Sequence, residues 1–198
     1  MIAISPKNNT TENTAAKSAS RTSYKVAIGG VVSALCLSLM FLTGIMPLLS
    51  MAIPIYAGAL MIVVAREVST SWAFAAYCAV SLLSLFLTPD KEAATLFIMF
   101  FGYYPIILPK LNKLRIAPLR IIIKLAVFNA AMVIWYRLIV FIMGTYDFFS
   151  EFAFLGEYAV LGVMVFINLV FLLYDYTIKI IYDFYVKYFR PKYLGKKN

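Results

Sequence analysis

The chain has 198 residues, of which 63% are hydrophobic and 16% aromatic, and its formal net charge is +9. In a soluble protein this charge would suggest nucleic-acid binding. Here the basic residues flank long apolar runs, so they indicate membrane topology and contact with anionic lipids, with no nucleic-acid partner. A chain of this size has room for one membrane domain and no second globular domain.

Six apolar runs follow one another, each close to the roughly 17–25 residues that cross a hydrocarbon core of about 30 Å. Lipid offers no partners to free backbone polar groups, so each run is predicted to be a helix and not a strand. The sequence therefore predicts an all-α polytopic membrane protein with transmembrane helices at about 26–43, 45–65, 72–87, 93–108, 121–143 and 158–178.

Two tails flank this domain, which we place at residues 25–182. Residues 1–24 are rich in Asn, Thr, Ser, Lys and Ala without an apolar pattern, and we expect a disordered cytoplasmic tail. The first apolar run starts too late for a cleavable signal peptide and is taken as a retained helix. Residues 183–198 are predicted to be a basic cytoplasmic tail.

The connections alternate in charge. Basic residues fill both tails, the second–third connection and the fourth–fifth connection, whereas the other three connections contain one basic residue and most of the acids. A Lys/Arg bias in short loops marks the cytoplasmic side. We therefore expect both termini in the cytoplasm, and a multi-pass protein of a bacterial cytoplasmic (plasma) membrane.

Residues that carry catalysis are scarce. The chain has no histidine, the commonest general base and metal ligand. Cys36 and Cys78 lie inside predicted helices at a spacing that suits neither a metal site nor a redox motif. We expect no enzyme activity, no cofactor and no metal.

Four polar residues fall inside the last two predicted helices. Lys124 and Asp175 lie at about the same depth, roughly 5 Å inside the cytoplasmic end, so they are expected either to form an ion pair or to snorkel separately to the interface. Asn129 and Asn168 lie near mid-membrane, where adjacent antiparallel helices could pair the two amides as structural glue.

Arg137 lies roughly 9 Å inside the outer end of the fifth predicted helix. An arginine at that depth needs an anionic partner or a water-filled cavity, so Arg137 is expected to contact either a ligand or an acidic loop. An outward-facing pocket would also include Asp90, Glu92, Tyr103 and Tyr104. The alternative for Asp90 and Glu92 is to complement the start of the fourth helix, and for the tyrosines a place in the core or against lipid.

The first predicted helix has a face of small residues, because Gly30, Ala34 and Ser38 recur every four positions. Such a face lets a second helix approach closely. The second helix could belong to this chain or to a partner subunit.

Six helices, both termini inside, a length near 200 residues and this small-residue face together resemble the substrate-binding S components of energy-coupling factor (ECF) transporters. The resemblance implies an S-component-like bundle that binds a small nutrient near its outer face. On this chain the binding loops would be Gly44–Ile53, Asp90–Glu92 and Tyr146–Glu157. It also implies that the first helix docks a membrane coupling subunit that works with ATPases.

Segments 89–94 and 100–105 also resemble a group of small uncharacterised bacterial membrane proteins with six helices. That resemblance implies no activity. Two functions are therefore expected: a substrate-capture subunit of an ECF-type uptake transporter, or a membrane interaction or scaffold protein of the bacterial envelope that transports nothing.

Overall fold

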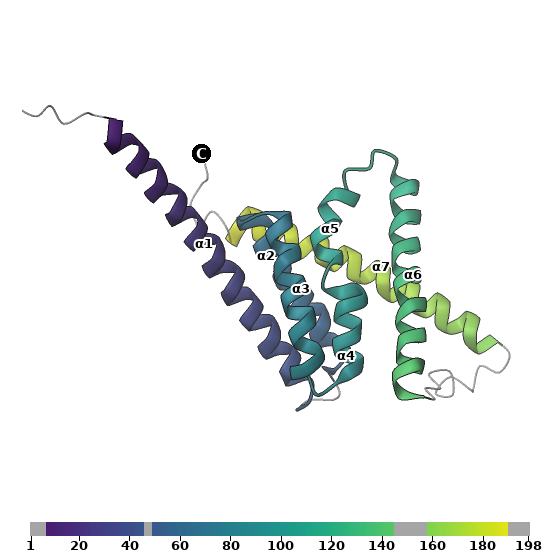
Figure 1. Cartoon of the computed structure of the whole chain (residues 1–198). Coiled ribbons are helices and arrows are strands. Elements are labelled where there is room, and N and C mark those ends of the chain that lie inside the picture. Colours follow the sequence, from purple (N-terminus) through teal and green to yellow (C-terminus); the bar gives the residue numbers. More distant parts are fainter. Residues whose placement is uncertain (1–6, 46–48, 145–157, 190–198) are drawn as a thin grey trace, which may run out of the picture.

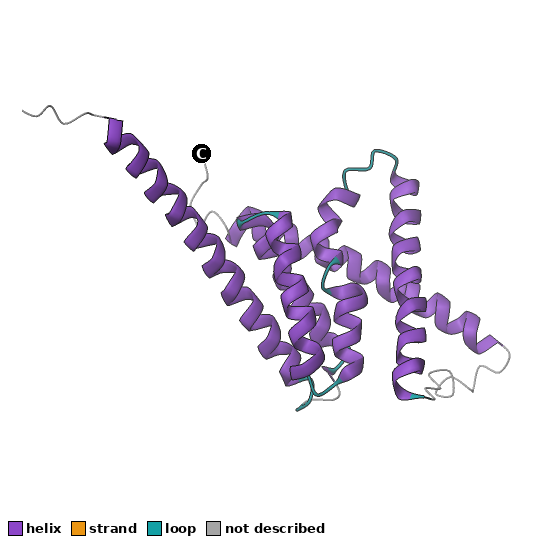
Figure 2. Cartoon of the chain, in the orientation of Figure 1, coloured by secondary structure: helices purple, strands orange, loops and turns teal. Residues whose placement is uncertain are grey.

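The computed structural model describes residues 7–45, 49–144 and 158–189, and all secondary structure in these ranges is helical (Figures 1 and 2). In chain order the elements are α1 (Lys7–Leu42), α2 (Ala52–Glu67), α3 (Thr70–Leu87), α4 (Lys91–Leu96), the π-helix η2 (Phe97–Phe101), α5 (Tyr104–Leu111), α6 (Ala117–Met143), α7 (Ala159–Phe184) and the π-helix η4 (Tyr185–Phe189).

Five of the described segments are long and apolar enough to cross a membrane: 19–42, 70–87, 91–111, 117–142 and 160–188. Their outward sides are apolar, and Phe86, Phe141 and Leu161 are each more than 60% exposed. Apolar surface on this scale is normally covered by lipid or protein. The chain is therefore an all-α multi-pass membrane protein.

The helix α1 differs from the expected disordered tail. It begins at Lys7, so residues 7–24 are helical and continue the apolar part without a break. Figure 1 shows this part projecting past the ends of α2 and α3. An apolar pattern marks only the part of a helix that lies in lipid or in the core. The α1 helix extends beyond that part into polar sequence, which has no such pattern. The rest of the expected tail, residues 1–6, lies outside the described residues.

The helix α2 occupies the centre of the first half of the bundle. It has 16 residues and starts at Ala52, later than the expected start at residue 45. Pro54 lies in its first turn, where proline has no N–H bond to lose. Its buried residues Ala57, Met61 and Val64 join Val32, Cys36 and Met40 of α1 and Ala73 and Val80 of α3 in one core cluster.

The segment expected as a single helix at 93–108 is composite. The α4, η2 and α5 helices follow one another along one path, interrupted at Gly102 and Tyr103. Gly102 lies against Tyr77, since a Cβ at Gly102 would come within 2.6 Å of that ring. The described C-terminal helical run extends through η4 to Phe189, seven residues beyond the domain end predicted at residue 182.

The helices α6 and α7 cross at a large angle (Figure 1). An aromatic cluster fills the space where they meet η2 and α5: Phe128 and Phe171 stack with ring centroids 4.5 Å apart, and Phe100 and Tyr104 pack beside them. This second core cluster lies around the polar side chains that connect α6 to α7.

Candidate functional site

An ion pair joins α6 to α7. The Lys124 Nζ atom donates to both carboxylate oxygens of Asp175, at 2.9 and 2.7 Å, and the Tyr104 hydroxyl of α5 donates to Oδ1. The Lys124 side chain is 7% exposed and that of Asp175 20%. Of the two arrangements expected for these residues, the structure has the ion pair, with Tyr104 as a third member.

The second polar contact lies two helical turns from Asp175 on α7. Asn129 and Asn168 exchange reciprocal amide hydrogen bonds of 2.8 and 3.2 Å. Each amide also donates to the carbonyl four residues earlier in its own helix, Leu125 and Met164 respectively. Both polar contacts satisfy groups that lipid could not solvate, so their geometry is that of structural connections between helices.

Three of the five residues expected to line an outward pocket make other contacts in the structure. The Tyr104 hydroxyl donates a hydrogen bond to Asp175, and the Tyr103 ring packs edge-on against Tyr77. Asp90 lies at the start of α4, roughly 20 Å from Tyr104 along the composite helix. Its Oδ1 atom accepts hydrogen bonds from the N–H groups of Glu92 and Ala93, which is N-cap geometry.

Arg137 is an exposed residue on α6. The loop expected at 146–157, which contains the acids Glu151 and Glu157, lies outside the described residues. Part of the first expected loop, residues 46–48, is also outside them. Contact between Arg137 and a ligand or an acidic loop stays a prediction.

The small-residue face of α1 is open. Gly30, Ala34 and Ser38 are all exposed, while Val32 and Cys36 on the opposite side are buried against α2 and α3. A Cβ atom built on Gly30 would meet nothing within 4 Å. Within the described residues this face therefore has no helix of the same chain against it, and it is accessible to a helix from another molecule.

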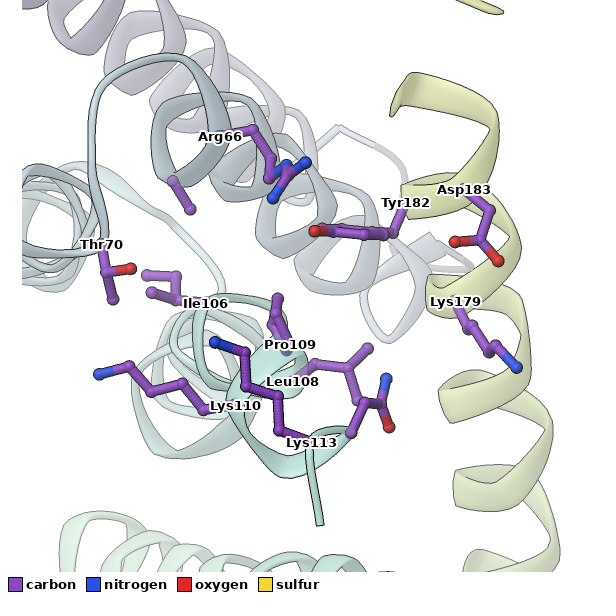
Figure 3. Close-up of a pocket in the computed structure, with 12 residues that line it drawn as sticks. Arg66, Thr70, Ile106, Leu108, Pro109, Lys110, Lys113, Lys179, Tyr182 and Asp183 are labelled. Atoms are coloured by element: carbon purple, nitrogen blue, oxygen red, sulfur yellow. The ribbon is translucent and has the colours of Figure 1, made fainter. Parts of the chain in front are cut away.

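A basic cavity lies where α2 and α5 end, and the last turns of α7 also line it (Figure 3). It has a volume of about 520 Å³. The charged residues that line it are Arg66 of α2, Lys110 and Lys113 at the end of α5, and Lys179 and Asp183 of α7.

Arg66 is held by stacking. Its guanidinium carbon lies 4.9 Å from the centre of the Tyr182 ring, and its Nε atom is buried with no hydrogen-bond partner among the described residues. In Figure 3, Arg66 and Tyr182 face each other across one side of the cavity. The sequence located these basic residues only as markers of topology, since nothing in it shows that segments more than 100 residues apart share one cavity.

No protein-family model, no curated protein and no solved structure matches this chain.

Proposed function

We propose that the chain is the membrane-embedded substrate-capture subunit of an ECF-type uptake transporter for a small nutrient. It crosses the bacterial plasma membrane six times with both termini in the cytoplasm. It performs no catalysis itself and works with a coupling subunit and ATPases.

The observation that carries this proposal is the open small-residue face of α1. Gly30 and Ala34 leave the α1 backbone accessible on the side away from α2 and α3. Helices in lipid associate chiefly by close packing of such faces. A partner helix can therefore dock there without any rearrangement of this chain's core.

The distribution of charge supports the proposed orientation. The C-terminal ends of α2 and α5 lie at one end of the bundle, and the start of α4 lies at the other (Figure 1). Arg66 and Lys110 are in those last turns, and Asp90 and Glu92 are at that start. The positive-inside rule assigns the basic end to the cytoplasm. The sixth span would be α2, whose 16 residues measure about 24 Å. The neighbouring helices would shield the non-helical residues that precede it from lipid.

A second function, an envelope interaction protein without transport, is favoured by a different observation. The expected ligand residues Asp90, Tyr103 and Tyr104 point to separate parts of the fold. An interaction protein needs the α1 face but no pocket. The identity of its partner distinguishes this function from capture.

The test is affinity purification of the detergent-solubilised chain from its native host, with mass spectrometry of the recovered proteins and small molecules. Gly30→Leu and Ala34→Leu add bulk to the α1 face, and Ala79→Leu makes a matched change on the exposed side of α3. We expect the wild type and Ala79→Leu to recover an ATPase and a membrane coupling subunit, and the two α1 variants to lose both.

Normal membrane insertion and thermal stability of the α1 variants would show that the loss reflects docking. Recovery of envelope proteins without an ATPase refutes the transporter and supports the interaction protein. Equal behaviour of all three variants refutes α1 as the docking face.

A further inference from the structure

We infer that the basic cavity between α2, α5 and α7 is a binding site for a phosphate-bearing anion. The anion is either the headgroup of an anionic phospholipid or a phosphorylated solute, and both present the same group to the site. This site is separate from the α1 face, so it does not depend on the proposed transport role.

The charges of the cavity are unbalanced. Four cations and one carboxylate, Asp183, line the cavity, and none of the four forms an ion pair among the described residues, where Lys124–Asp175 is the one salt bridge. Arg66 and Lys113 approach from separate elements without an acidic partner between them, and their like charges repel one another (Figure 3). A bound anion removes that repulsion.

Arg66 provides the directional contact. Stacking on Tyr182 fixes its planar guanidinium, and the buried Nε–H has no acceptor among the described residues. The Nε–H itself is covered by the protein, so a ligand would be contacted by the terminal N–H groups of the guanidinium. Two parallel N–H groups of arginine fit a phosphate or carboxylate. Lys113, on the α5 side of the cavity, adds a flexible point charge (Figure 3).

Simpler roles account for part of this pattern. Arg66 and Lys110 lie in the last turns of α2 and α5, where positive charge favours the helix dipole. Cytoplasmic loops are also basic in general. Neither role requires charges from separate helices around one concavity, or a buried guanidinium nitrogen without an acceptor.

A phosphate-bearing group is favoured over a simple carboxylate. Its several oxygens can engage Arg66 and Lys113 at once (Figure 3). The volume of about 520 Å³ is larger than an isolated phosphate needs and falls in the range of small-molecule sites. At the end of the bundle the cavity also lies where lipid headgroups would be found in a membrane.

The test uses the full-length, detergent-solubilised protein in two arms. In the lipid arm, the protein is reconstituted in phosphatidylcholine nanodiscs with or without phosphatidylglycerol, and retained lipid is measured by native mass spectrometry. In the solute arm, inorganic phosphate and pyrophosphate are titrated calorimetrically at constant ionic strength, with chloride as the reference anion.

The variants are Arg66→Gln and Lys113→Gln, and Arg115→Gln is the matched control because Arg115 is an exposed cation near the same end outside the cavity. Loss of a charged hydrogen bond should weaken binding roughly tenfold or more in the cavity variants. Arg115→Gln should retain wild-type binding.

Each outcome has a distinct meaning. Retention of phosphatidylglycerol that the cavity variants lose identifies a lipid site, and phosphate or pyrophosphate binding with the same pattern identifies a solute site. Absence of binding in both arms overturns the inference. Equal losses in Arg66→Gln and Arg115→Gln also overturn it, since they would reflect general attraction of anions to a basic surface.

Discussion

The strongest test of how the bundle holds together is removal of Lys124. Asp175 accepts three hydrogen bonds, two from Lys124 and one from Tyr104, and its side chain is 20% exposed. In Lys124→Met the carboxylate keeps only the Tyr104 hydroxyl. Breaking a buried ion pair at one partner typically costs about 3–5 kcal/mol, because the remaining charge is left uncompensated.

The size of the loss in unfolding free energy distinguishes an uncompensated Asp175 charge from a simple loss of packing. Methionine retains most of the volume of the lysine stem, so little packing is lost. Replacing all three groups, as Lys124→Met/Asp175→Leu/Tyr104→Phe, removes every member of the polar cluster. We expect this triple variant to recover most of the stability, since apolar residues of similar volume often replace a buried ion pair at little cost.

The free energy of unfolding can be measured by denaturant titration of the protein in mixed micelles, followed by circular dichroism. Lys187→Met is the control, because it removes an exposed lysine from η4, the continuation of α7. A loss for Lys124→Met no greater than that for Lys187→Met would refute a structural role of the ion pair. Failure of the triple variant to recover would refute the uncompensated charge as the cause.

The same unfolding assay tests two further contacts. Asn129→Ala should cost about 0.6–2 kcal/mol of unfolding free energy, the range for an interhelical hydrogen bond in lipid. Asn129→Ala/Asn168→Ala should cost less than twice that amount, because the first substitution already breaks the pair. Additive losses would contradict the pairing. Gly58→Ala should be strongly destabilising because its Cβ would lie 2.0 Å from the Phe101 carbonyl oxygen. Gly30→Ala should leave stability unchanged or raised, because its Cβ would meet nothing within 4 Å. Equal effects of the two substitutions would contradict the close approach at Gly58.

The helices that sequence predicted well are those whose limits coincide with a change in polarity. The expected helix at 72–87 is α3 (Thr70–Leu87), and that at 121–143 is α6 (Ala117–Met143). The ion pair of Lys124 with Asp175 is one of the two arrangements that the sequence left open for these residues.

Apolar patterns in the sequence could not predict helices made of polar residues or contacts between distant parts of the chain. Residues 7–24 are helical although they have no apolar pattern to reveal it. The sequence places Tyr104 near an outward pocket, but the direction of this side chain depends on the π-helix that precedes it. The basic cavity brings Arg66 near Lys179, which only the folded chain reveals.

The π-helix η2 shows how local backbone geometry positions the polar cluster. The Gly102 N–H bonds to the Phe97 carbonyl five residues earlier, which widens the turn. The Tyr77 hydroxyl of α3 donates to the Ile98 carbonyl at 2.6 Å, so a neighbouring side chain supports the irregular turn. An extra residue in one turn rotates the later residues of the helix by about 100° relative to an uninterrupted α-helix.

That rotation determines which side of α5 faces α7. Pro105 has no N–H to offer the Phe101 carbonyl, and this carbonyl approaches α2 at Gly58, where a side chain would not fit. The backbone is held against α2 at Phe101, and Tyr104, three residues later, donates to Asp175 of α7. The short backbone segment from Phe101 to Tyr104 therefore connects the close approach at Gly58 to the ion pair of Lys124 with Asp175. We expect Gly58→Ala to weaken the contact of Tyr104 with Asp175 as well as the packing of α2.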